Sequence, residues 1–201
     1  SSPEAKARAE ELFEGCEGER LHMDLESAEM AKHAMNAYLA MMISFSGEIS
    51  DLCEKTGANA LLVMEALRKE PRVSPQAPLM PGLGFGGGTL ARDVQALRMA
   101  GRQKGVPTPV MDAALAANTA RNSYVQRKLQ QALGSLAGKT IAFFGLTYKP
   151  GTDTLRRSLA LEVIEELAKS GATLRAYDPA IKPPVQLSQK VSVCPSAQEA
   201  A

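Results

Sequence analysis

The sequence has 201 residues, 45% of them hydrophobic and 22% charged, and its 23 basic and 22 acidic residues leave a formal net charge of +1. This balance is ordinary for a globular protein and provides no field that would attract nucleic acid or a membrane surface. Aromatic residues make up only 4%, too few for base-stacking platforms. No apolar run reaches the length of about 18 residues that a membrane span needs. We therefore expect neither nucleic acid nor membrane as a partner.

The cysteines and histidines are few and scattered. Cys16, Cys53 and Cys194 form no C-x-x-C pair, and an odd, sparse set of this kind predicts reduced thiols and a cytoplasmic location. His22 and His33 lack the spacing of metal ligands, so we predict no metal site. The sequence opens with charged, helix-forming residues and without an initiator methionine. We therefore expect it to be part of a longer protein.

Helical patterning dominates the first 135 residues. We predict helices over residues 3–15, 27–55, 60–67, 90–104 and 110–133. Ser27 is the expected N-cap of the second helix, in which apolar residues from Met30 to Leu52 recur every three or four positions and so share one face. Prolines between residues 71 and 81 exclude regular structure before a glycine-rich segment. Residues 1–135 are thus predicted to form a mainly α domain.

Strand patterning begins after residue 135. Residues 140–146, TIAFFGL, form a short apolar run typical of a buried strand, and a helix over 159–169 and a strand over 173–177 follow. Strand, helix and strand in this order indicate a βαβ unit with a parallel sheet, to which residues 191–193 could add a third strand. We predict a partial, Rossmann-like α/β domain over residues 136–201, incomplete at its C-terminal end.

Polar residues at helical spacing are the first candidates for chemistry. Lys32 and Asn36 are four apart and share a helix face, where they could hold a hydroxyl group or a developing oxyanion, or simply form the solvated side of the helix. Asp93 follows Thr89 by four residues. Its carboxylate could orient a water molecule, or compensate the dipole of its own helix.

The segment PGLGFGGG, residues 81–88, contains five glycines that let backbone N–H groups approach an anion or a sugar. It could equally be a flexible loop. It is no P-loop, because Gly-Lys-Ser/Thr is absent, and it does not follow a strand as a Rossmann fingerprint does. Arg72 among the prolines, Lys149 just after a strand, and Arg156 and Arg157 near a helix start are further candidates for binding phosphate or carboxylate.

Four collinear stretches together resemble one family. They are SAEMAKHAMNAYLA (27–40), EPRV (70–73), PGLGFGGGTLARDV (81–94) and GLTYKPGTDTLRRS (145–158), followed by YDP at 177–179. They are similar to the UDP-glucose/GDP-mannose dehydrogenases over nearly the whole sequence. The resemblance implies that family's helical central domain, through which it dimerises, followed by part of its C-terminal nucleotide-sugar domain. The family's N-terminal NAD-binding Rossmann domain lies outside this sequence.

The resemblance also implies roles for the candidate residues. Members of the family oxidise a sugar C6 alcohol to a carboxylate with two NAD, through a thiohemiacetal and a thioester on a cysteine. Lys32 and Asn36 are then expected around the reacting oxygen, and Asp93 as the aspartate that handles water. The expected binding residues are Arg72 reaching a substrate across the dimer, Phe85, Gly86 and Gly87 in the substrate loop, Lys149 on the substrate, and Arg156 near the NAD phosphates.

The sequence departs from the family's loop, which reads G-[FY]-G-G-S-C-[FL]-P-K-D. Here Gly88 stands for the serine and Thr89 for the catalytic cysteine. A threonine hydroxyl is not ionised near neutral pH without a base, whereas a cysteine is partly thiolate. We expect a homodimeric, NAD-dependent UDP-sugar dehydrogenase with altered or lost activity. The alternatives are a non-catalytic nucleotide-sugar-binding or dimerisation module, and a hydroxyacid dehydrogenase, against which the GFGGG and TYKPGTDT segments argue.

Overall fold

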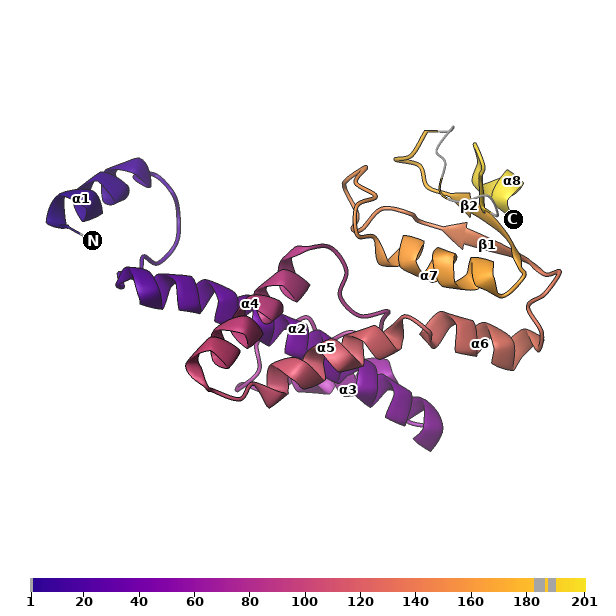
Figure 1. Ribbon diagram of the computed structural model, residues 1–201, viewed down its shortest axis with the longest axis horizontal. Helices are drawn as coiled ribbons and strands as arrows, with labels where there is room; N and C mark the ends of the chain where they lie inside the picture. The colour runs from indigo at the N-terminus through magenta and orange to yellow at the C-terminus, as the bar shows by residue number, and fades with distance from the viewer. Residues whose placement is uncertain (1, 183–186, 188–190) are drawn as a thin grey trace.

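A long helix, α2 (Leu25–Thr56), runs through the first half of the chain (Figure 1). The computed structural model describes residues 2–182, 187 and 191–201. The N-cap of α2 is Asp24, whose side chain accepts the Ser27 N–H at 2.7 Å, so the predicted cap at Ser27 is wrong by one turn. A carboxylate caps as well as a hydroxyl does, and the residues between Asp24 and Ser27 are compatible with a helix. Gly57, with φ of 78°, ends the helix in the left-handed conformation.

The other helices before the glycine-rich loop are shorter. Helix α1 (Pro3–Leu12) lies apart from the rest of the chain and buries none of its residues (Figure 1). Helix α3 (Ala60–Lys69) is capped by the Asn59 side chain. None of the helices in the described part of the chain has the length and apolar character that a membrane crossing would need.

The segment predicted as one helix over residues 110–133 is two helices, so that prediction is wrong. Helix α5 (Pro109–Arg121) ends where Asn122 and Ser123 begin a turn, and α6 (Tyr124–Leu133) leads toward the sheet (Figure 1). Asparagine and serine compete with helical hydrogen bonds through their own side chains. The Arg121 guanidinium also stacks over the Tyr124 ring, 4.0 Å from its centroid, across the break.

Small residues let α2 and α4 (Thr89–Lys104) pack closely. Ala37 and Ala40 of α2 are buried against Val94 of α4 and Phe85 of the preceding loop. The bulky members of the predicted apolar face remain accessible instead: the exposed fractions of Met30, Phe45 and Leu52 are 53%, 45% and 60%. The face that α2 buries within this chain is therefore only part of its apolar surface.

The second half of the chain forms a three-stranded parallel sheet in the order β1 (Thr140–Phe144), β2 (Thr173–Tyr177), β3 (Val191–Val193). The crossover helix α7 (Leu159–Lys169) packs on it, and the short helix α8 (Ala197–Ala200) lies near the C-terminus (Figure 1). Leu146, Ile164, Leu167 and Leu174 are almost fully buried between helix and sheet. The predicted fold class, a mainly helical part followed by a small α/β part, is confirmed.

Asp178 fixes the chain beyond the first strand. Its carboxylate accepts the backbone N–H groups of Leu146, Thr147 and Ala180 at 2.7, 3.1 and 2.8 Å. Burial alone would raise the pKa of Asp178, but these hydrogen bonds outweigh it and hold the pKa below its ordinary value. The ionised side chain thus anchors the segment that carries Tyr148 and Lys149 past the sheet edge.

Candidate functional site

A carboxylate with no solvent exposure, that of Asp93, lies between α2 and α4. Its Oδ2 accepts hydrogen bonds from Lys32 Nζ and Asn36 Nδ2, and its Oδ1 accepts one from Arg92 Nε at 3.1 Å. Lys32 and Asn36 reach the same oxygen because they stand one turn apart on α2. The structure therefore brings together three of the predicted catalytic residues.

The electrostatics of this cluster favour a charged aspartate. Burial would raise the pKa of Asp93, but the hydrogen bonds from Lys32, Asn36 and Arg92 prevail and hold the pKa well below its usual range. The Lys32 side chain is 51% exposed, so part of its ammonium group remains open to a ligand. An ammonium and an amide held in this way can donate to an oxygen that gains negative charge.

His33 is a member of the cluster that the sequence did not indicate. Its Nδ1 lies 3.4 Å from Asp93 Oδ1, is itself buried, and makes no hydrogen bond with the described residues. Helical spacing of three or four residues does not predict it, because His33 directly follows Lys32 and adjacent residues do not share a helix face. Only the approach of α4 places a carboxylate against the imidazole.

The glycine-rich loop is anchored from α5. Asn118 accepts the Phe85 N–H at 2.8 Å and donates to the Phe85 carbonyl at 3.2 Å. The buried Arg121 donates to the Gly82 carbonyl at 2.6 and 3.1 Å and to Asp51 Oδ1 at 2.6 Å. Neither residue was predicted, since a lone polar side chain on a helix gives no signal of a distant loop. The loop is thus a fixed structure.

The same loop is docked onto the α/β part of the chain. Gly87 donates its N–H to the Arg157 carbonyl at 2.8 Å. A Cβ on Gly86 would lie 2.8 Å from Leu159 Cγ, so only glycine permits this close approach. Phe85, predicted to contact substrate, is buried in the helical core. Its side chain therefore positions the loop, and any ligand contact at this position falls to the backbone.

A cleft of about 290 Å³ lies where the loop, α4 and the α/β part meet. It is lined by Gly87, Gly88, Thr89, Arg92, Tyr148, Thr154, Arg156 and Arg157. Thr89 is the first residue of α4 and is exposed, and Gly88 before it supplies no side-chain cap. Arg92 both lines this cleft and bonds Asp93, so the Asp93 cluster and the cleft are contiguous.

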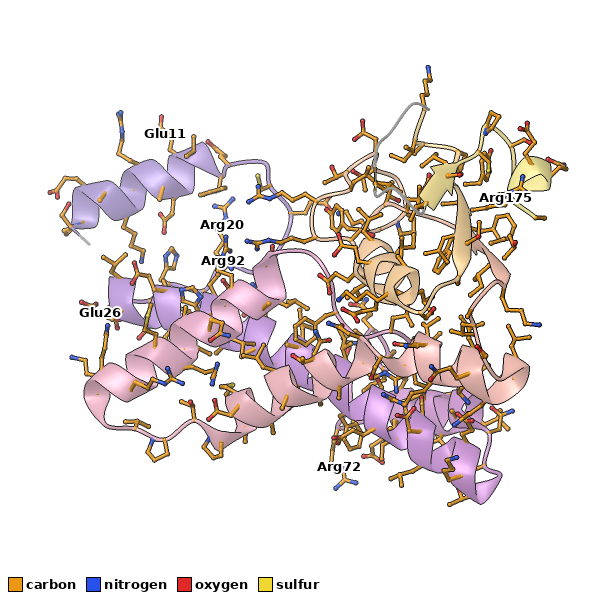
Figure 2. All side chains as sticks on the ribbon, turned by 45° about the vertical axis from the view of Figure 1, so that its right-hand side comes forward. Glu11, Arg20, Glu26, Arg72, Arg92 and Arg175 are labelled. Atoms are coloured by element: carbon orange, nitrogen blue, oxygen red, sulfur yellow. The ribbon has the colours of Figure 1, made fainter. Side chains whose placement is uncertain are left out.

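The remaining predicted residues divide into two groups. Arg156 lines the cleft, and Lys149 lies beside it, with its ammonium 5.4 Å from the centroid of the Tyr148 ring. Arg72 does not join them: its side chain is 87% exposed and pairs with Glu70 at 2.6 Å. In Figure 2 Arg72 points outward on the side of the molecule away from Arg92. Within one copy of the chain Arg72 is not part of this site.

The fold and the site together define the class of protein. A helical part carries a Lys–Asn–Asp cluster, and its glycine-rich loop docks onto a part with a small parallel sheet. Residues 26–120 match the UDP-glucose/GDP-mannose dehydrogenase family's central domain, and residues 142–201 match its UDP binding domain. The chain belongs to this family, whose members are NAD-dependent nucleotide-sugar dehydrogenases.

Individual relatives support the same assignment. The UDP-glucose 6-dehydrogenases TuaD and YwqF of Bacillus subtilis are 36% and 35% identical to this chain, over 89% and 94% of its length and 39% and 42% of theirs. A UDP-glucose dehydrogenase from Pyrobaculum islandicum superposes with a TM-score of 0.92 at 28% identity, over 100% of this chain and 46% of that one. A UDP-D-ManNAc dehydrogenase from Pyrococcus horikoshii superposes with a TM-score of 0.77 at 27% identity, over 90% and 43%. The chain therefore spans about two fifths of the length of the curated relatives it matches.

Proposed function

We propose that the protein binds a UDP-sugar at the junction of its two parts and acts on the sugar C6 alcohol in an NAD-dependent oxidation. The observation that carries the proposal is the convergence of Lys32 and Asn36 on the buried carboxylate of Asp93, next to the cleft that contains Thr89. This arrangement supplies hydrogen-bond donors for an alcohol oxygen and a fixed negative charge to orient them.

Each residue has a distinct task in this proposal. Lys32 and Asn36 hold the C6 oxygen and stabilise the charge that develops on it, while Asp93 orients both donors and positions water. NAD, when bound, supplies the hydride acceptor. Arg156 is suited to the anionic part of that cofactor because none of the described residues that line its cleft is acidic. We place Lys149 on the substrate and Arg72 in the site of a partner copy.

Because residue 89 is a threonine, it provides no thiolate, and we propose that only the oxidation steps that need no thiolate take place. We infer that oxidation stops at the aldehyde or proceeds slowly through its hydrate, since no side chain at this position forms a thioester. The second candidate is a non-catalytic nucleotide-sugar-binding module, which Thr89 itself favours. Both candidates predict that the protein binds a nucleotide sugar, and only the first predicts that it oxidises the sugar. Binding is therefore tested first and turnover second.

Calorimetric titration of the protein with UDP-glucose is expected to give saturable binding. Lys149→Gln should weaken it by about tenfold, because a hydrogen bond to a charged group is lost. The matched control is Lys139→Gln, which removes an exposed lysine just before β1 and should leave the affinity unchanged. Binding that is absent in the wild type, or equal in the two variants, would contradict the proposed nucleotide-sugar site.

We also propose a homodimer formed through the helical part. An apolar groove of about 600 Å³ runs over α2, α4 and α5 and is lined by Met30, Tyr38, Val106 and Val110 among others. Met30, Tyr38, Val106 and Val110 are exposed by 50% or more, a cluster that monomers rarely leave open. Light scattering at micromolar concentration is expected to give twice the mass of one chain. A monomer under these conditions rules the dimer out.

We further propose a cytoplasmic location. The three cysteines are free: Cys16 is exposed, and Cys53 and Cys194 are buried. Unpaired thiols of this kind suit a reducing compartment.

A further inference from the structure

We propose that Gly88 and Arg157 act as a matched pair, in which the missing side chain at Gly88 admits the Arg157 guanidinium and thereby gives the cleft beside Thr89 affinity for a diphosphate group. Arg157 would be a specificity-determining residue of this cleft. The inference deepens the proposed function and rests on it, since the cleft borders the proposed substrate site.

The first observation is the fit between the two residues. A Cβ built on Gly88 would overlap Arg157 Nη1, closer than real Cβ atoms approach their neighbours, and would lie 3.3 Å from its Cζ. A serine at this position would therefore displace the guanidinium. The observed position of the Arg157 guanidinium requires that residue 88 has no side chain.

The second observation is that the backbone of Arg157 is tied down. Its φ is +57°, a left-handed conformation that non-glycine residues seldom adopt. Its carbonyl accepts the Gly87 N–H at 2.8 Å, which holds the residue against the loop. Because the backbone is held, the position of the guanidinium depends on its side-chain torsions and on the room that Gly88 leaves.

The third observation is an excess of positive charge. Among the residues that the structure describes, the cleft is lined by three arginines and by no acidic residue. Arg92 already bonds Asp93, whereas Arg156 and Arg157 form no ion pair with any residue that the structure describes. Guanidinium groups pair with phosphate through two parallel hydrogen bonds. A cleft of about 290 Å³ is suited to a diphosphate group and too small to enclose a whole nucleotide.

The test is a double-mutant cycle read by calorimetric titration with inorganic pyrophosphate at low salt. Arg157→Gln is expected to weaken binding by about tenfold or more. Gly88→Ser should weaken it in the same direction, because the guanidinium is displaced. The double variant should bind no more weakly than Arg157→Gln alone, since without Arg157 the serine has nothing to displace. Arg127→Gln, at an exposed arginine on α6, is the matched control and should bind as the wild type does.

Folding defects can be separated from binding in the same set of proteins. Gly88 has φ of −101° and ψ of −15°, a backbone conformation that serine adopts without strain. Gly88→Ser is therefore expected to fold, and its thermal melting beside that of the wild type separates weaker binding in the cleft from a loss of stability.

The inference is overturned if the wild type does not bind pyrophosphate, if Arg157→Gln binds it as the wild type does, or if the effects of the two single changes simply add. Parallel titrations with UDP-glucose and NAD identify which ligand supplies the diphosphate, because only that ligand loses affinity in Arg157→Gln. A wild type that binds UDP-glucose but not pyrophosphate would contradict this inference and would not affect the proposed function. Binding of pyrophosphate without binding of UDP-glucose removes the proposed function and leaves of this inference only the affinity of the cleft for a diphosphate group.

Discussion

Replacing Thr89 by cysteine in the full-length protein is expected to raise uronic acid formation from UDP-glucose and NAD by a thousandfold or more, on the order of what a lost nucleophile costs in other covalent enzymes. The number of NADH formed per sugar should rise to two. A cysteine at residue 89 would stand at the first position of α4, beside Arg92 and Arg156. The helix N-terminus and the two guanidinium groups favour a thiolate there.

Thr89→Ser is the matched control, because it keeps a hydroxyl and removes only a methyl group. It should behave as the wild type does in the same NADH count. Two NADH per sugar with uronic acid from the unaltered protein, at the rate of Thr89→Cys, would show that Thr89 does not block the second oxidation. No activity in Thr89→Cys, together with intact UDP-glucose binding, would favour the non-catalytic module.

Lys32→Met is expected to destabilise the protein by about 2–3 kcal/mol, more than the roughly 1 kcal/mol expected for Asp93→Asn. The two variants differ in their expected loss of stability because the two side chains differ in burial. The Asp93 carboxylate has no exposure, so losing the lysine leaves a buried charge with fewer donors. Losing the carboxylate leaves Lys32 and Arg92, whose side chains are 51% and 65% exposed and can be solvated. Urea denaturation followed by circular dichroism measures both changes.

Lys69→Met is the control for this pair. Lys69 and Glu65 form an ion pair four residues apart on α3, with side chains 75% and 48% exposed, and such pairs contribute about 0.5 kcal/mol or less. A loss in Lys69→Met as large as that in Lys32→Met would show that the buried carboxylate is not the cause.

The effect of Asp93→Asn should also depend on pH. The pKa of Asp93 is lowered on folding, so its ionised form stabilises the folded state fully above the unfolded-state value of about 4. That contribution is lost as the pH falls below this value toward the folded pKa. Because asparagine does not titrate, the stability difference between the wild type and Asp93→Asn should therefore fall between pH 7 and pH 3. An equal difference at both pH values would contradict an ionic origin.

The helices and strands were largely accessible from sequence because neighbouring residues encode them. The strand over residues 173–177 and the helix over 159–169 lie where their patterns indicated, since alternation and helical spacing are local properties. The break at Asn122 was missed because apolar spacing continues through it, while the contact of Arg121 with Gly82 depends on a loop 39 residues away. The domain division at residue 135 stays a prediction.

For the candidate site, residue identities and one-turn spacings were readable in the chain: Thr89 where the family resemblance predicts a cysteine, and Lys32 with Asn36 on a common face. Asp93 was a candidate too, but its hydrogen bond with Lys32 was not readable, because Asp93 is 61 residues from Lys32 and meets it only through the packing of α2 against α4. The place of His33 beside Asp93 and of Arg157 against Gly88 likewise arises from contacts between distant segments. The sequence pattern shows which side chains share one face of a helix. Burial, charge pairing and the space left by a glycine arise only when segments that are distant in the sequence pack together, so the tertiary structure alone decides them.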